Sequence, residues 1–225
     1  MNDPKQLIFP WIRANKSSLD NFYFESENLQ VKDTFNSGAD FLIYGEQECG
    51  KSFLLQSFCN QYAADKKSSL YVPLKEVLIH GTSFLDSIDT LELVCIDNID
   101  AISNRKEWEI AIFNLINNCM LSNCRLIFSS SLNPAKLNFD LNDLKSRIKK
   151  IEPVKVLPIS DQGLEDALSF VANKRLINLG EKEVQYIITH CNRSMKGLLN
   201  VLDRIDQVSA ELKRKITIPL IKKVI

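Results

Sequence analysis

Between positions 45 and 52 the chain reads Gly45-Glu46-Gln47-Glu48-Cys49-Gly50-Lys51-Ser52, a complete G-x-x-x-x-G-K-S pattern. An apolar run, Phe41–Tyr44, leads into it, and an amphipathic run, Ser52–Ala64, follows it. In a strand–loop–helix unit of this kind, backbone N–H groups and a helix N-terminus surround phosphate groups. The pattern therefore predicts a nucleotide-binding loop in which Lys51 neutralises the β and γ phosphates and Ser52 Oγ ligates Mg²⁺. The candidate binding residues of this loop are Gly45, Gly50, Lys51, Ser52 and Phe53.

Further apolar runs predict four more strands, at Leu70–Val72, Leu93–Ile96, Leu126–Phe128 and Val154–Leu157. All but the last are nearly unbroken in apolar character, which is typical of parallel strands covered on both faces. Helical patterns, including one at Glu107–Leu121, separate most of the runs. This alternation predicts an α/β domain with a parallel sheet and helices on both faces, over residues 39–158.

The pattern changes after Pro158, where no strand is expected. Ser160 suits a helix N-cap, and apolar residues follow it at helical spacing. We expect a small all-α domain over residues 159–225 that depends on its neighbour for stability. Residues 1–38 show no regular pattern and are expected to form an irregular N-terminal segment. The expected helices run from Ser160 to Leu176, over Glu181–Cys191, over Ser194–Leu212, and onward from Thr217.

The amino-acid composition excludes several classes of protein architecture. The 28 Lys and Arg residues balance 28 Asp and Glu residues, and 45% of the chain is apolar. This profile excludes disordered, collagen-like and coiled-coil architectures. No apolar run reaches the roughly 18 residues of a membrane helix, and the N-terminus lacks a signal-peptide layout, so we expect a cytoplasmic protein without membrane contact. The six cysteines form no C-x-x-C pair, and His80 and His190 lie far from Cys119 and Cys124, so no zinc-type site is expected.

The strand Leu93–Ile96 ends in an acid, Asp97, and Asn98 follows. In a chain with a phosphate loop, an acid at this place suits a Walker B carboxylate that reaches Mg²⁺. The next position commonly carries a second carboxylate that orients the attacking water, and an amide is a far weaker base. General-base assistance is worth roughly 10²–10⁴-fold in rate. We therefore expect nucleotide binding with weak or no hydrolysis by this chain alone.

A phosphate loop, a Walker B strand and a helical lid in this order resemble the AAA+ superfamily of P-loop NTPases. Over nearly its whole length the chain also resembles the Hda family, DnaA-related regulators that inactivate the bacterial replication initiator DnaA. The strings that carry this resemblance are Tyr71-Val72-Pro73-Leu74, Leu93-Val94-Cys95-Ile96-Asp97-Asn98-Ile99-Asp100, Trp108-Glu109 with Ala111-Ile112-Phe113, Leu144 with Ser146-Arg147, and Arg214-Lys215-Ile216-Thr217-Ile218-Pro219.

The resemblance implies roles for two arginines. Arg147 falls at the family's arginine finger, a guanidinium that stabilises transition-state charge on the γ-phosphate held by a neighbouring molecule. Without the resemblance, a surface arginine in a basic run is the simpler interpretation. Arg193 matches the sensor-2 arginine, which contacts the nucleotide phosphates from the lid; otherwise it is equally well a helix-start arginine. The sensor-1 acid is replaced by hydroxyls in Ser129-Ser130-Ser131, which again disfavours self-contained hydrolysis.

The N-terminal string Gln6-Leu7-Ile8-Phe9-Pro10 is similar to the pentapeptide by which this family binds the β sliding clamp of DNA polymerase III. Leu7 and Phe9 suit apolar anchors for a preformed groove, Gln6 can hydrogen-bond at its rim, and Pro10 limits the ordering entropy. Five residues match easily by chance, so the family resemblance carries this interpretation.

Together these resemblances imply a clamp-tethered protein, loaded with ADP or ATP and Mg²⁺, that presents Arg147 to ATP held by DnaA. Triggering that hydrolysis would prevent re-initiation of chromosome replication and would place the protein at the nucleoid and replisome. The residues leave open whether ADP or ATP is preferred and whether the chain forms a homodimer.

Two other classes of protein are weighed against this interpretation. A DnaA-like DNA-binding initiator needs a helix-turn-helix domain, and the about 65 residues after the α/β domain leave no room for one. We therefore expect no sequence-specific DNA binding. A helicase-loader-type ATPase needs efficient hydrolysis of its own, which Asn98 and the missing sensor-1 acid disfavour.

Overall fold

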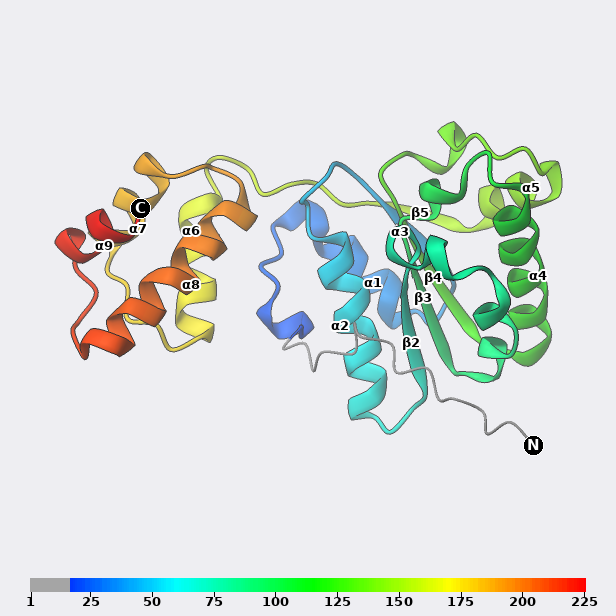
Figure 1. Cartoon of the computed structure of the whole chain (residues 1–225), viewed down its shortest axis with the longest axis horizontal. Coiled ribbons are helices and arrows are strands. Elements are labelled where there is room, and N and C mark those ends of the chain that lie inside the picture. The colour runs from blue at the N-terminus through cyan, green and yellow to red at the C-terminus, as the bar shows by residue number, and fades with distance from the viewer. Residues whose placement is uncertain (1–16) are drawn as a thin grey trace.

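The computed structural model describes residues 17–225, which form a sheet flanked by helices and, beyond it, a separate group of helices (Figure 1). The sheet has the order β2-β3-β4-β1-β5, and every neighbouring pair is parallel, as the sequence predicts. The last strand begins and ends two residues earlier than expected: the Val156 N–H still donates to Tyr44 O of the neighbouring strand at 2.8 Å, and the Leu157 N–H donates to Asn28 instead. The strands are β1 (Phe41–Tyr44), β2 (Ser69–Pro73), β3 (Leu93–Asp97), β4 (Arg125–Ser130) and β5 (Glu152–Lys155).

Alternate strand residues build two separate cores, one on each face of the sheet. One core packs against α4 (Lys106–Ser122) and α5 (Asn142–Lys150), and the short α3 (Leu74–Val77) joins it. The other core packs against α1 (Leu29–Asn36) and α2 (Lys51–Ala64). Strand residues of the α4 side are Leu42, Val94, Ile96, Leu126 and Phe128. Strand residues of the α2 side are Phe41, Ile43, Cys95, Ile127 and Val154.

Helix α1 corrects the expectation of an irregular segment before the first strand. Val31 and Phe35 are buried in it, and the Phe35 ring stacks on Phe58 with centroids 4.2 Å apart. The end of α1 is fixed by Arg125 of β4, which donates to the carbonyls of Phe35 at 2.8 Å and Ala39 at 3.0 Å. A cation at a helix C-terminus is stabilising, but this one comes from far along the chain, so local sequence does not reveal it.

The lid consists of helices with their own core, apart from the sheet (Figure 1). Gly163 and not Ser160 is the N-cap of the first of them, although the Ser160 hydroxyl accepts the Gly163 N–H at 3.0 Å in the turn that leads into the helix. The Ser160 N–H and hydroxyl donate to the Glu25 carboxylate at 3.0 and 2.7 Å, which fastens the linker to the N-terminal segment. The helix also ends before Leu176, which has a left-handed φ of 59° and is 93% exposed. The lid helices are α6 (Leu164–Lys174), α7 (Glu181–His190), α8 (Met195–Leu212) and α9 (Ile218–Val224).

Within the described residues, no helix is both long enough and apolar enough to cross a membrane.

Candidate nucleotide site

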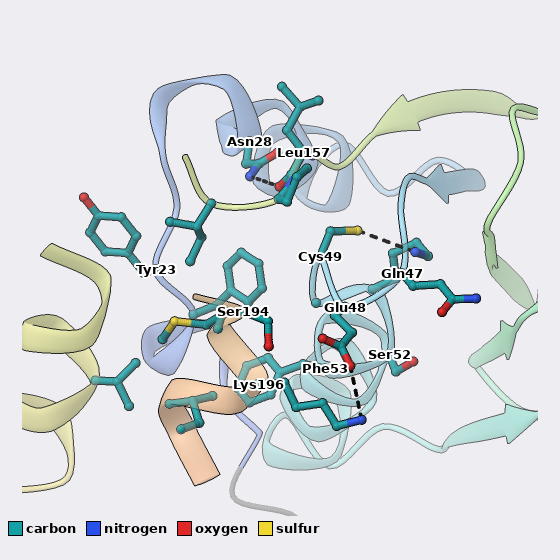
Figure 2. Close-up of a pocket in the computed structure, with 18 of the residues that line it drawn as sticks. Tyr23, Asn28, Gln47, Glu48, Cys49, Ser52, Phe53, Leu157, Ser194 and Lys196 are labelled. Atoms are coloured by element: carbon teal, nitrogen blue, oxygen red, sulfur yellow. Dashed lines mark hydrogen bonds and ion pairs between the residues drawn. The ribbon is translucent and has the colours of Figure 1, made fainter. Parts of the chain in front are cut away.

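A cavity of about 700 Å³ lies between the phosphate loop, the N-terminal segment, the linker and the lid (Figure 2). Its position explains why residues far apart in sequence contribute to one site: the loop follows β1, while the linker follows its sheet neighbour β5. The predicted site residues that line it are Gly50, Lys51, Ser52, Phe53, Asn98 and Arg193.

The phosphate loop is held tightly between its neighbours. A Cβ on Gly45 would lie 2.1 Å from the carbonyl oxygen of Val156, so only glycine lets the linker pass this closely. Gly50 has a φ of +93°, and a Cβ there would lie 2.6 Å from the Phe22 ring. The glycines of the motif therefore serve close approach as well as backbone geometry.

Lys51 is 7% exposed, and its ammonium group turns back onto the loop. Nζ donates to the carbonyls of Gly45 at 2.9 Å and Glu46 at 2.5 Å, and lies 3.5 Å from Cys49 Sγ. These contacts satisfy the buried cation and place it within the loop, where phosphate oxygens would be its natural acceptors. Glu46 and Glu48 are exposed, so neither carboxylate is buried within the loop.

Asp97, the predicted Walker B acid, is 2% exposed at the end of β3. Tyr71 Oη donates to its Oδ2 at 2.6 Å, and Ser129 Oγ donates to its Oδ1. The Ser129 hydroxyl also accepts the N–H of Asn98 at 2.8 Å. Both carboxylate oxygens of Asp97 therefore already accept protein hydrogen bonds. Of the two predicted Mg²⁺ ligands, Ser52 lines the cavity and Asp97 is not among its lining residues.

The lid contributes positive charge. Arg193 lies just before α8 and lines the cavity. Lys196, in the first turn of α8, lines it too. Figure 2 shows Lys196 reaching from the lid to Glu48 on the loop, with Nζ 3.4 Å from Oε1. Arg175 pairs with Asp203 inside the lid. Among the described lining residues, the cations Lys51, Lys75 and Arg193 are in no ion pair, so they are available to an anionic ligand.

Other lining residues of the cavity are apolar or aromatic. Tyr23, Leu157, Ile159 and Leu164 line it. Asn28, 2% exposed, fixes the linker here: its amide donates to Leu157 O at 3.0 Å and its Oδ1 accepts the Leu157 N–H at 2.9 Å (Figure 2). A lining that combines cations with apolar and aromatic surface suits a ligand with a phosphate end and an aromatic end.

Arg147 lies away from this cavity, on α5 at the end of the molecule opposite the lid (Figure 1). It is partly exposed, its Nη1 lies 3.6 Å from Met120 Sδ, and no carboxylate of the described residues forms an ion pair with it. The helix is anchored by the buried Glu109, which accepts the N–H of Leu141 at 2.7 Å. Arg147 is therefore presented at the surface by a fixed helix.

The sequence interpretation did not identify several residues of the site. Tyr71 was noted only as part of a string, although one hydroxyl in an otherwise apolar strand is a signal that such a side chain meets a polar partner. Asn28 and the Glu48–Lys196 pair gave no local signal, because their partners are distant in sequence. The string Gln6–Pro10 lies outside the described residues, and its role stays a prediction. In residues 17–225 no group of three or more His, Cys, Asp or Glu side chains could hold a metal ion.

Comparison with known proteins identifies two domain families that match this chain. Residues 39–161 match the model of the AAA domain, and residues 161–225 match the model described as Hda, lid domain. A protein of Haemophilus influenzae, described as an uncharacterized protein, is 31% identical over 227 residues that cover 98% of each chain.

Solved structures show the same fold. Domain III of the replication initiation protein DnaA from Thermotoga maritima has a TM-score of 0.77 at 15% identity, covering 93% of this chain and 95% of that one. AMPPCP-bound DnaA from Aquifex aeolicus has a TM-score of 0.71 at 18% identity, covering 89% of this chain and 67% of that one. The RuvB Holliday junction branch migration motor of Thermotoga maritima has a TM-score of 0.66 at 16% identity, covering 92% and 70%.

Proposed function

We propose, because this chain belongs to the AAA family and its last 65 residues, 161–225, match the Hda lid, that it is a DnaA-related regulator of replication initiation. It binds ADP or ATP in the cavity between the loop and the lid. It then stimulates hydrolysis of ATP held by DnaA and so prevents re-initiation of chromosome replication.

The observation that carries this proposal is the place of Arg147. It does not line the chain's own cavity, and α5 lies at the far end of the molecule from the lid (Figure 1). A guanidinium that is partly exposed, held by a fixed helix and in no ion pair within the described chain suits contact with phosphates of another molecule. In other NTPases an arginine supplied in this way is worth about 10³–10⁵ in rate.

Weak hydrolysis by the chain itself is consistent with a role in which it activates hydrolysis by a partner. Asn98 lines the cavity where a second Walker B acid would stand, and Ser131 lines it at the end of β4. Neither side chain is a base, so water near the γ-phosphate would lack general-base assistance. The water-activating groups would then come from the partner, and the present chain would supply the cation.

The proposal includes a tether to the DNA polymerase III β clamp through Gln6–Pro10, which would hold the protein at the replisome on the nucleoid. Its support is the similarity of that string to clamp-binding peptides. Deletion of residues 6–10 should abolish clamp binding in solution while ADP binding is retained. Clamp binding that survives the deletion would remove this part of the proposal.

The central experiment compares Arg147→Ala with a matched control, Lys149→Ala, an exposed cation of the same helix. With clamp loaded on DNA and ATP-bound DnaA, Arg147→Ala should lower the stimulated hydrolysis rate at least about 100-fold. Clamp binding, ADP binding and thermal stability should stay at wild-type values, and Lys149→Ala should retain stimulation. Stimulation that survives in Arg147→Ala would refute the assignment.

A further inference from the structure

Arg147 of α5 meets the last turn of α4 through a thioether. Its Nη1 lies 3.6 Å from Sδ of Met120, and the two helices pack side by side on one core. Leu144 and Ile148, which flank Arg147 along α5, are fully buried in that core. The packing of the two helices therefore brings the guanidinium to Met120.

Burial does not account for the apolar side chains at this end of α4. The Met120 side chain is 58% exposed, and that of the next residue, Leu121, is 85% exposed. A methionine in such a place gains little from the hydrophobic effect, because most of its surface stays in water. What Met120 offers to its neighbour is a polarizable sulfur on an unbranched chain, which is a weak hydrogen-bond acceptor.

A neutral acceptor restrains a guanidinium without neutralising it. A carboxylate in this place would form a charge-assisted ion pair, which would hold the side chain but offset its charge before a phosphate arrives. The thioether carries no charge, so the charge of Arg147 and its remaining N–H donors stay available. Lys149 and Lys150, both exposed, add positive charge on the same helix. The surroundings of Arg147 thus favour an anion supplied by another molecule.

We infer that Met120 is a positioning residue for Arg147: it holds the guanidinium at the surface of α5 in a fully charged state, ready for the γ-phosphate of a nucleoside triphosphate bound to a partner. The inference rests on the arginine role of the proposed function and adds the residue that orients that arginine. Because Met120 acts through Arg147, its replacement should change the stimulated rate at saturation more than the affinity between the partners.

The contact itself is tested on the purified full chain without DnaA. The chain has three methionines, Met1, Met120 and Met195, so carbon-13 labelling of their methyl groups gives a simple NMR spectrum. Met120→Leu identifies the Met120 signal. In Arg147→Ala this signal should shift and sharpen, because its neighbour is gone, while the Met195 signal should stay in place. Lys149→Ala should move neither signal. A Met120 signal that does not respond to Arg147→Ala would overturn the inference.

The role of the contact is tested in the stimulated reaction, with clamp loaded on DNA, ATP-bound DnaA, and this chain added to saturation. Met120→Glu places a carboxylate beside Arg147 and should lower the maximal rate at least about fivefold. Met120→Gln has the same shape without the charge and should stay within about twofold of the wild type. Met120→Ala removes the contact and should lower the maximal rate about threefold, because the guanidinium is less well oriented. The half-saturating concentration should change less than about twofold in all three variants.

Leu121→Ala is the matched control, since Leu121 is also exposed and apolar but has no acceptor for Arg147. It should keep the wild-type rate, and thermal unfolding should show all variants equally folded. Equal losses in Leu121→Ala and Met120→Ala, or in Met120→Gln and Met120→Glu, would overturn the inference. A higher half-saturating concentration at an unchanged maximal rate would do the same, because it would make Met120 a docking residue.

Failure of the proposed function gives a different result. If Arg147→Ala keeps stimulation, the arginine role itself is wrong. If Arg147→Ala loses stimulation and Met120→Glu keeps it, the arginine role holds and only the inference about Met120 fails.

Discussion

Glu109 of α4 accepts the backbone N–H of Leu141 at 2.7 Å, and its second oxygen accepts the N–H of Asn104 at 3.1 Å. The carboxylate is fully buried. One acidic side chain thus joins the start of α4 to the start of α5, the helix that carries Arg147. The exposed arginine owes its fixed position to a buried acid more than thirty residues earlier in the chain.

Replacing Glu109 should therefore disturb both stability and the presentation of Arg147. Glu109→Ala leaves the N–H of the partly buried Leu141 and the N–H of the exposed Asn104 without their acceptor, which should lower the free energy of unfolding by about 1–3 kcal/mol. Urea denaturation measures this loss. Glu107→Ala, an exposed acid on the same helix, is the control and should change stability by less than about 1 kcal/mol. Equal stability of the two variants would show that α5 does not need this anchor.

Gly45→Ala should damage the contact between the phosphate loop and the linker. The new Cβ would lie 2.1 Å from the carbonyl oxygen of Val156, a backbone atom that cannot rotate away. We expect a loss of about 1–3 kcal/mol in stability and weaker ADP binding, because the loop must move to relieve the overlap. In the control Gly180→Ala, the Cβ meets only the flexible Glu183 carboxylate, so both properties should stay near wild type. An unchanged ADP affinity in Gly45→Ala would contradict the tight packing.

The Glu48–Lys196 pair should tune affinity more than stability. Its side chains are 44% and 70% exposed, so the pair contributes little to folding. Glu48→Gln removes a negative charge beside the phosphate loop and releases Lys196 to the ligand, so ADP should bind severalfold more tightly at low salt. The gain should shrink at high ionic strength, since salt screens exposed charges. Glu46→Gln, on the same loop and in no ion pair within the described chain, is the control. Weaker ADP binding in Glu48→Gln would show instead that the pair is needed to hold the lid.

Asp40 predicts a pH dependence of stability. Burial raises the pKa of its carboxyl, although the Leu126 N–H and Arg125 act against this. A raised folded-state pKa means that the ionised form is disfavoured in the fold, so stability is lost as pH rises through that pKa. Asp40→Asn, which keeps an acceptor for Leu126, should be more stable than the wild type at neutral pH. The difference should close as pH falls towards the ordinary aspartate pKa of about 4.

Thermal unfolding of both proteins across this pH range measures the effect. Asp33→Asn, an exposed acid of α1, should show no such convergence. A gap between wild type and Asp40→Asn that widens towards low pH would contradict the direction of the shift.

Local patterns were sufficient for the α/β layout and for most helix positions. The phosphate loop is recognisable because its chemistry needs consecutive residues, and apolar runs identify strands because both sheet faces are covered. The predicted start of α6 and the predicted irregular segment before β1 were wrong, because contacts with residues distant in sequence decide both. Gly163 takes the N-cap position of α6 while Ser160, three residues earlier, bonds to Glu25, and α1 forms against the sheet with its end held by Arg125.

The sequence by itself determined which residues are candidates for the chemistry: the glycines, Lys51 and Ser52 of one loop, the acid that ends one strand, and an arginine in a basic helix. Only the tertiary structure decided which hydrogen bonds and packing contacts these side chains make. Parallel strands bring Tyr71, Asp97 and Ser129 together although they are separated by 26 and 32 residues, and spacing along a chain does not specify such contacts. The physical reason is that side-chain hydrogen bonds between strands depend on register and strand order, which form only when the whole sheet assembles.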